Sequence, residues 1–317
     1  MDTCRVCGNT QNNTYHVFQE KYFGLGGEFE YIECGVCQSL SIMKIPEEMQ
    51  RYYPQTYYAH TAMPYNHFYG YLKGKRDGYY LTGSGIVGRL ISPWLKFPPY
   101  IDWLRSLALP FGSSILDVGC GSGTLVASLQ DAGFEAMGID PYIGKSITYP
   151  NGARVLNRSL QETGGRYDCI MLHHSLEHMA EPRKALGHIG RLLRRGGKVL
   201  IRVPLTGTYA WKTYGENWFQ LDAPRHFVIY SDYGLRYLAA ELGFETTKVV
   251  YDSGAGQFWA SEQYVKGITL TGKRSYAVQP ANSIFTPEQI SEYAGRAVLL
   301  NAKADGDQAA FYLEKTV

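Results

Sequence analysis

The clearest pattern in the chain is a short apolar run that leads into three alternating glycines. Residues 115–118 read Ile-Leu-Asp-Val, a composition typical of a strand that is buried on both faces. Glycines directly after a strand let the backbone bend sharply and approach a ligand closely. From Thr124 onward, apolar residues recur at helical spacing until Gly133. The pattern therefore predicts a buried strand, a ligand-binding turn and a helix.

A second apolar run, residues 134–139, predicts the next strand, which ends at Asp140. In a Rossmann-like fold, a carboxylate at this position accepts hydrogen bonds from both hydroxyls of a ribose, so we expect a nucleoside ligand. The glycines follow the pattern G-x-G-x-G, and Asp117 precedes them. A carboxylate there repels a pyrophosphate, whereas it suits the positive amino and sulfonium groups of S-adenosylmethionine. A Rossmann-like turn with another function is the alternative.

Three segments, in order, resemble the class I S-adenosylmethionine-dependent methyltransferases. They are LDVGCGSG at 116–123, GID at 138–140 and YDCIMLHHSLEHMAEP at 167–182. The resemblance covers residues 111–317, and it implies an α/β fold with a Rossmann-like sheet of seven mostly parallel strands between helices, the last strand antiparallel. The cofactor is then expected to contact the turn, the next strand end and the loops that follow: Asp117, Gly119, Cys120, Gly121, Gly123, Asp140, Pro141, Ser159, Leu160 and His173.

Shorter patterns predict the rest of this domain. Apolar runs indicate strands near 153–156, 167–172, 198–203 and 246–251, with a final strand over 306–313. The segments 205–230 and 253–305 are then insertions in the methyltransferase-like domain. Thr286, Pro287 and Gln289 form a capping-box pattern, which predicts the start of the main helix of the second insertion.

The composition limits the choice of partners. The 317 residues carry 31 basic and 29 acidic side chains, so no overall field favours nucleic acid or an anionic membrane. No stretch of about 18 uncharged apolar residues occurs, and the N-terminus lacks an apolar signal segment. We therefore expect a soluble, cytoplasmic protein with no membrane span. The 26 tyrosines suit a surface that stacks on sugars or bases, or they simply pack.

Four cysteines near the start of the chain form two C-x-x-C pairs. They are Cys4, Cys7, Cys34 and Cys37. Two such pairs predict a tetrahedral four-thiolate site for a structural Zn²⁺, and disulfides are the alternative. A closed site of this kind has no open position for catalysis, so we interpret residues 1–45 as a zinc ribbon that holds together a segment with little core of its own.

Residues 46–110 are rich in aromatic side chains, including the run Tyr52-Tyr53-Pro54 and the pair Tyr57 and Tyr58. We predict a helical linker that covers the cofactor mouth as a lid. Tyr57 and Tyr58 are expected to contact substrate or cofactor, or else to pack on the catalytic domain. A zinc ribbon followed by such a segment and a class I domain resembles methyltransferases of sugar modification and of surface-polysaccharide or antibiotic biosynthesis.

The densest group of ionisable side chains follows the strand at 167–172, in the run HHSLEH at 173–178. Ligands of open α/β sheets bind at the carboxyl ends of the strands, so this run is expected to face the reacting methyl group. If Ser175 begins a helical turn, His174, Glu177 and His178 share one side. Such a group suits a general base or a divalent metal ion, or it braces the loop.

The insertion at 205–230 lies on the same edge, and it contributes the expected substrate contacts Trp218 and Arg225. Sugar C-methyltransferases with a similar ribbon carry a catalytic histidine at the position that matches His226, within a Tyr-x-Glu-His pattern. Here the run is Ala223-Pro224-Arg225-His226, which disfavours carbanion chemistry. Arg225 suits the phosphates of a nucleotide diphosphate, or it clamps the loop. His226 is the first choice for the base and His174 the second.

The sequence thus predicts an S-adenosylmethionine-dependent methyltransferase that acts on a small or glycan-type acceptor, with a nucleotide-linked sugar as the leading candidate. A zinc-ribbon RNA methyltransferase and a non-catalytic cofactor-binding scaffold are the alternatives. A near-neutral charge and the absence of a lysine-arginine run between Cys7 and Cys34 argue against RNA. The acceptor atom and the oligomeric state do not follow from the sequence.

Overall fold

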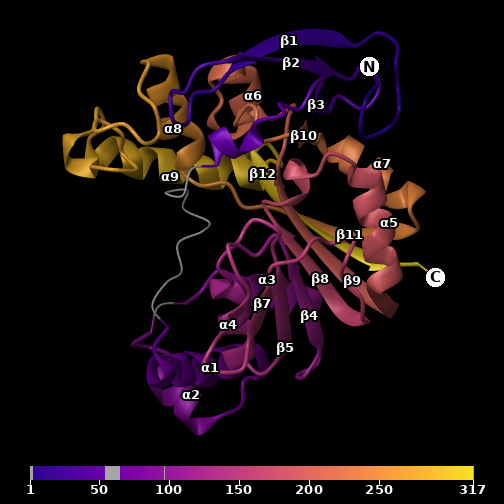
Figure 1. Cartoon of the computed structure of the whole chain (residues 1–317). Helices are drawn as coiled ribbons and strands as arrows, with labels where there is room; N and C mark the ends of the chain where they lie inside the picture. Colours follow the sequence, from indigo (N-terminus) through magenta and orange to yellow (C-terminus); the bar gives the residue numbers. More distant parts are fainter. Residues whose placement is uncertain (1–2, 54–64, 96, 317) are drawn as a thin grey trace.

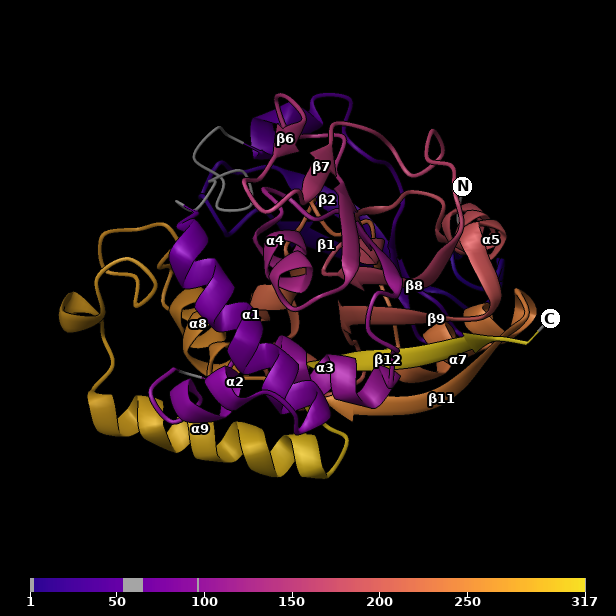
Figure 2. The ribbon, with the colours of Figure 1, turned by 90° about the horizontal axis from the view of Figure 1, so that it is seen from below.

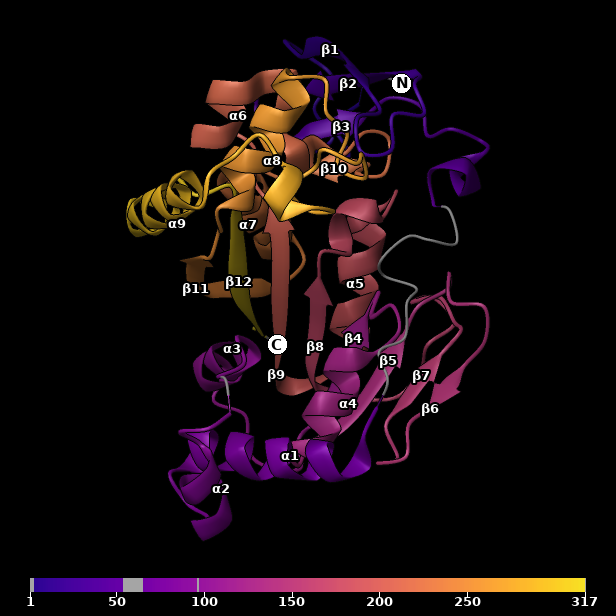
Figure 3. The same ribbon diagram turned by 90° about the vertical axis from the view of Figure 1, so that its left-hand side faces the viewer.

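A mixed eight-stranded sheet forms the centre of the part of the chain that the computed structural model describes, residues 3–53, 65–95 and 97–316. The strand order is β11-β12-β9-β8-β4-β5-β7-β6 (Figure 3). Neighbours from β9 to β7 run parallel, whereas β12 is antiparallel to both β9 and β11. The strands are β4 (Ser114–Val118), β5 (Glu135–Ile139), β6 (Ile147–Thr148), β7 (Arg154–Leu156), β8 (Tyr167–His173), β9 (Leu193–Pro204), β11 (Phe244–Tyr251) and β12 (Gln308–Lys315).

Seven of these strands confirm the predicted Rossmann-like sheet, including its antiparallel last strand. The eighth, β6, has two residues and pairs antiparallel with β7 at the sheet edge. A strand of two residues has no room for a repeating apolar pattern, so the sequence carries no signal for it.

Alternating apolar residues of the sheet bury both of its faces. Ile115 and Met171 belong to one core, and their neighbours Leu116 and Ile170 belong to the other. The first face packs against α3 (Tyr100–Leu107) and α4 (Thr124–Asp131), and the second against α5 (Pro182–Leu192) and α7 (Asp232–Glu241) (Figure 1). The result is a three-layer α/β/α arrangement, which explains why the strands read as continuous apolar runs.

The N-terminal region forms a second sheet that uses a strand from the first insertion. Within the described residues its order is β1-β2-β3-β10, and β10 pairs antiparallel with β3. This sheet lies beyond the carboxyl ends of β8 and β9 (Figure 3). The apolar core on its inner side is continuous with the core around α5 and α7. The strands are β1 (Thr14–Gln19), β2 (Glu28–Glu33), β3 (Leu40–Ile42) and β10 (Val228–Ile229).

Helices α1 (His67–Thr82) and α2 (Ile86–Ile91) do not form the expected lid. They pack on each other, and α1 also contacts α4 (Figure 2). The contact with α4 is close, since a Cβ built on Gly74 would stand 2.1 Å from the carbonyl oxygen of Asp131. Both helices lie near the end of the sheet opposite to the ribbon (Figure 3). The exposed tyrosines of α1 thus reflect a peripheral helix rather than a cover for the cofactor.

The two insertions pack against each other beside the ribbon (Figure 1). The capping box predicted for the second insertion is present, with the Thr286 hydroxyl accepting from the Gln289 amide. None of the helices described is both long enough and apolar enough to cross a membrane. The remaining helical segments are η1 (Met49–Tyr52), η3 (Leu176–His178), α6 (Tyr209–Tyr214), η4 (Gly215–Asn217), η5 (Phe219–Leu221), α8 (Gly256–Val265), η6 (Pro280–Asn282) and α9 (Pro287–Ala302).

Candidate functional site

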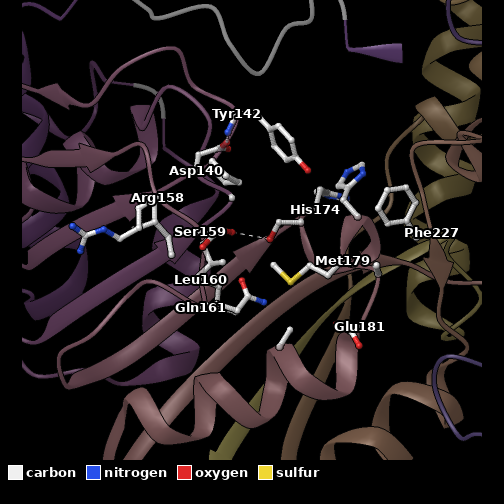
Figure 4. A pocket seen from close by; sticks show the side chains of 18 of the residues that line it. Asp140, Tyr142, Arg158, Ser159, Leu160, Gln161, His174, Met179, Glu181 and Phe227 are labelled. Atoms are coloured by element: carbon white, nitrogen blue, oxygen red, sulfur yellow. Dashed lines mark hydrogen bonds between the residues drawn. The ribbon is translucent and has the colours of Figure 1, made fainter. Parts of the chain in front are cut away.

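A cavity of about 470 Å³ opens at the carboxyl ends of β4, β5 and β8. Its lining combines the glycine turn, the loops after β5 and β7, the η3 turn and two segments from outside the sheet (Figure 4). The lining residues used below are Tyr53, Gly119, Asp140, Pro141, Tyr142, Ser159, Leu160, His174, His178, Met179 and Phe227.

The turn after β4 has room only for glycine. Gly119 and Gly123 have φ of +73° and +81°, a conformation that other residues rarely adopt. A Cβ at Gly119 would stand 2.5 Å from the Cβ of Ser175, and one at Gly123 would stand 2.1 Å from Val155. These close approaches bring the η3 loop and β7 against the turn, so the glycines shape one wall of the cavity.

Two carboxylates lie at this wall with different surroundings. Asp140 lines the cavity, and its carboxylate accepts hydrogen bonds from the amides of Gly121 (2.9 Å) and Tyr142 (2.8 Å). Asp117 is 3% exposed, and its Oδ1 has no hydrogen-bond partner among the described residues. Burial, with a contribution from Asp140, raises the pKa of Asp117 to about 7. A buried carboxylate oxygen without a partner fits the positive amino group of a bound S-adenosylmethionine.

The predicted cofactor residues divide into a lining group and a supporting group. Five of them line the cavity: Gly119, Asp140, Pro141, Ser159 and Leu160. Cys120, Gly121 and Gly123 build the turn behind this lining, and Asp117 lies beneath it.

His173 does not fit its predicted role as a cofactor contact. Its ring packs on Trp103 of α3, with 4.6 Å between ring centroids, and burial lowers the pKa of the imidazole well below its usual value. The reason is strand alternation, because His173 follows Cys169 and Met171 on the face of β8 that α3 and α4 cover.

His174 and Glu177 form the pair that the sequence spacing predicts. His174 lines the cavity (Figure 4). Its Nδ1 lies 3.4 Å from Glu177 Oε1. Glu177 is fully buried. Burial acts to raise the pKa of this carboxyl, but the interaction with His174 and the nearby His178 and His226 outweigh it, so the pKa of Glu177 is lowered. The carboxylate can therefore orient the His174 ring.

His178 lines the cavity, whereas His226 lies behind it with 7% of its surface exposed. Their ring centroids are 4.8 Å apart. Burial lowers the pKa of His226 to about 4, despite the nearby Asp222 and Glu177. Of the two histidines predicted as the base, His174 thus lines the cavity, whereas His226 does not.

Arg225 and Trp218 are wrong as substrate contacts. The Arg225 side chain is fully buried, its guanidinium pairs with Asp222 (Nε–Oδ2 2.9 Å) and Glu20 (3.1 Å), and it stacks over the ring of Tyr22. Trp218 is also fully buried and donates to Asp307 (2.9 Å). Asp222 is three positions away, but Glu20 is about 200 positions away in the chain, and the local sequence does not reveal that second partner.

Aromatic residues that the sequence analysis did not assign complete the lining. The rings of Tyr53 and Tyr142 stack almost parallel, 5.9 Å apart, and Phe227 faces the same space (Figure 4). Tyr142 stands two positions after Asp140, and Tyr53 belongs to the Tyr-Tyr-Pro run. Their closeness in sequence to these motifs is the signal that could have identified them as lining residues. The expected contacts Tyr57 and Tyr58 lie outside the described residues.

The four N-terminal cysteines converge as predicted. Their sulfurs lie within 4.8 Å of one another, and the pairs Cys4–Cys37 and Cys7–Cys34 are both 3.5 Å apart. A tetrahedral ion with Zn–S bonds of about 2.3 Å separates its sulfurs by roughly 3.8 Å. The amide of Cys37 donates to the sulfur of Cys34 (3.4 Å). The cluster is consistent with a small zinc-ribbon-like element.

Comparison with known proteins gives a family for the central part of the chain. Residues 96–249 match the family model described as a methyltransferase domain. This part of the chain is similar to methyltransferase domains and has their Rossmann-like α/β fold. A ubiquinone biosynthesis O-methyltransferase of Aeromonas salmonicida is 32% identical over 119 residues, which are 33% of this chain and 49% of that protein. One of Nitrosococcus oceani is 33% identical over 115 residues, covering 32% and 48%.

The chain thus spans about half the length of these curated relatives. Among solved structures, a magnesium protoporphyrin IX methyltransferase of Synechocystis with bound SAH has 14% identity and a TM-score of 0.43, over 81% of this chain and 91% of that one. The matched methyltransferase domain contains the glycine turn, Asp140 and the HHSLEH run, whereas the cysteine cluster and the second insertion lie outside it.

We expect Arg225→Gln to act on stability. The substitution leaves Glu20 and Asp222 buried without their cation, which costs about 3–5 kcal/mol in unfolding free energy. Arg236→Gln is the matched control, because its pair with Asp232 is exposed and worth less than about 1 kcal/mol. Urea unfolding of both variants measures this. If Arg225→Gln left the urea midpoint unchanged and weakened the binding of a phosphorylated acceptor, Arg225 would be a phosphate contact after all.

Proposed function

We propose that this chain transfers a methyl group from S-adenosylmethionine to an oxygen of a small, hydroxylated acceptor. The observation that carries the proposal is one cavity that combines two kinds of chemistry. The glycine turn and Asp140 stand at one part of its lining, and His174 with its partner Glu177 stands at another. Methyl transfer needs the acceptor to be aligned and, for a hydroxyl, its proton to be removed.

The cofactor side of the cavity suits a nucleoside with a positive amino acid tail. Asp140 is held in place by two backbone amides, and its position after β5 is the one from which a carboxylate contacts ribose hydroxyls. Ser159 and Leu160, after β7, are the proposed contacts to the base. Asp117 supplies the negative charge beneath the turn. When bound, S-adenosylmethionine supplies the methyl group.

The acceptor side is proposed to be the region of His174, Met179 and Phe227 (Figure 4). His174 accepts the proton of the acceptor hydroxyl, and Glu177 stabilises the imidazolium that forms. The O-methyltransferase relatives support oxygen as the acceptor atom.

A glycan-type acceptor, such as a nucleotide-linked sugar, remains our leading candidate. The stacked Tyr53 and Tyr142 and the nearby Phe227 support it, because aromatic rings pack well on the apolar faces of sugars. Arg225 no longer contributes to this choice. Phenolic acceptors are the comparison class, since the relatives named above act in ubiquinone biosynthesis.

We also propose that the cysteine cluster holds one structural Zn²⁺. The sulfur spacing and the amide donor to Cys34 support thiolates around a small cation. The six cysteines all lie within the described residues and none of them forms a disulfide, which suits a reducing compartment such as the cytoplasm. The ion would stabilise the ribbon and, through the pairing of β3 with β10, the edge of the cavity where Phe227 lies.

The proposed reaction is tested by S-adenosylhomocysteine release against three panels: nucleotide-linked sugars, phenols and structured RNA. We expect turnover on a sugar or a phenol, with mass and NMR spectra that show an O-methyl product. Turnover on RNA alone would replace the small-acceptor proposal with a nucleic-acid one. Cofactor binding without turnover on any panel would favour a scaffold role.

His174→Ala should lower kcat by about 100- to 10,000-fold, the usual contribution of a positioned base. The KM for S-adenosylmethionine should stay near the wild-type value, because His174 stands apart from the Asp140 part of the lining. His188→Ala is the control, since His188 lies on α5 outside the cavity lining, where its ring contacts the carbonyl of Thr163 and the side chain of Arg191. Steady-state kinetics on the active acceptor measures both. Wild-type turnover in His174→Ala would assign the proton to another group.

Cys34→Ser should abolish the bound zinc and lower the stability of the whole chain, since the ribbon shares its core with the catalytic domain. With about 2–4 °C in Tm per kcal/mol for a domain of this size, loss of a few kcal/mol lowers the Tm by roughly 10 °C. Cys120→Ala, which removes a thiol outside the cluster, should keep one zinc per chain. Elemental analysis and calorimetry measure both effects. Zinc retained in Cys34→Ser would refute the assignment.

A further inference from the structure

We propose that Glu177, His178 and His226 form a second metal site, for one divalent transition-metal ion, beside the cavity. Each of the three offers one ligand atom, and these atoms lie within 4.8 Å of one another. An ion with bonds of about 2.1 Å brings its ligand atoms roughly 3–3.5 Å apart, so small side-chain rotations close the site. The residues come from η3 and from the turn before β10, two segments that meet only in the folded chain.

Both histidines direct Nδ1 at a backbone carbonyl oxygen, which leaves Nε2 as the ring nitrogen for a metal ion. His178 Nδ1 lies 2.8 Å from the carbonyl oxygen of Arg225 and 3.2 Å from the Tyr53 hydroxyl, which can also accept, and His226 Nδ1 lies 2.8 Å from the carbonyl oxygen of Gln220. A carbonyl oxygen only accepts, so each Nδ1 carries the proton and each Nε2 keeps its lone pair. Histidines that bind metals almost always donate their other N–H to a carbonyl or carboxylate in this way.

The carboxylate between them has a pair with His174 but no hydrogen bond within the described residues. Both oxygens of Glu177 are fully buried and lack a hydrogen bond from any described residue. Burying a carboxylate costs free energy unless the charge is paired. The His174 Nδ1 approaches only one oxygen of Glu177, at the long distance of 3.4 Å. Within the described residues, no hydrogen bond joins Glu177 to His178 or to His226. The three groups therefore converge without satisfying each other, which a shared cation would correct.

The donor set indicates the kind of ion. Two imidazoles and one carboxylate suit Mn²⁺, Fe²⁺, Co²⁺ or Zn²⁺, whereas a four-thiolate cluster selects zinc. The nearest other acid, Asp222, is 3.9 Å from His226 Nε2 but is held by Arg225. The site is therefore chemically distinct from the cysteine cluster, and the two can be loaded separately.

The place of the site suggests its role, and that role, unlike the site itself, rests on the proposed function. His178 lines the cavity, so the ion would adjoin the space proposed for the acceptor. A divalent ion there would bind an acceptor oxygen and lower the pKa of its hydroxyl, and this favours acceptors with two neighbouring oxygens.

The test is a titration of the zinc-loaded protein with Co²⁺ alone, followed by its absorption spectrum. We expect one equivalent of Co²⁺ with the spectrum of nitrogen and oxygen ligands and without the charge-transfer band of thiolates. Glu177→Gln and His226→Asn should weaken this binding by about 10- to 100-fold or more. The asparagine can keep the hydrogen bond to Gln220 while it lacks a nitrogen at the Nε2 position.

His188→Asn is the matched control and should bind Co²⁺ as the wild type does. Retained zinc content and retained S-adenosylhomocysteine binding show that each variant is folded. The site would be overturned if the zinc-loaded wild type bound no Co²⁺. It would also be overturned if Glu177→Gln and His226→Asn bound Co²⁺ as tightly as the wild type does. No methyl transfer enters this experiment, so failure of the metal site and failure of the proposed reaction are observed separately.

Discussion

The site depends most on the buried ion pairs that Arg225 forms with Glu20 and Asp222. A guanidinium without solvent must be paired, and its partners come from three segments: Glu20 after β1, the Tyr52 carbonyl in the linker, and Asp222 in the first insertion. The backbone of the same residue accepts the hydrogen bond of His178. One side chain therefore holds the ribbon, the linker and the insertion together at the point where the histidines line the cavity.

This arrangement joins the N-terminal sheet to the core of the α/β domain, so it is not an appended module. The Tyr31 hydroxyl on β2 donates to the carbonyl of His226, and β3 pairs with β10 on the other side of that residue. The Cys37 carbonyl accepts from Ser231, which caps α7. The cysteine cluster thus stabilises a surface on which the end of the first insertion is folded, and the position of His226 is set from both sides.

The sequence predicted what depends on local patterns. Strand and helix periods, the glycine turn, the capping box at Thr286 and the two cysteine pairs can each be recognised within a few residues. The antiparallel last strand follows from the family that these patterns resemble. The lining residues Gly119, Asp140 and His174 could be named because they stand at the ends of predicted strands.

What could not be predicted depends on contacts between distant segments. Arg225 looked like a phosphate ligand because Glu20 is about 200 positions away in the chain. His173 looked like a cofactor contact because it stands at the end of a predicted strand. The sequence does not show which face of that strand a helix covers, and Trp103 of α3 covers the face with His173. The peripheral place of α1 follows from its close contact with α4 at Gly74, which no aromatic pattern indicates.

The shared sheet also sets an order of events during synthesis. Ser41 and Leu40 of β3 pair with Val228 and Ile229, which leave the ribosome many seconds later at about 5–20 residues per second. Until then the inner side of the ribbon, with Tyr31, has no cover. The four cysteines need none of the later chain to come together, so the Zn²⁺ that we propose there would hold the nascent ribbon in shape while its partner is still being made.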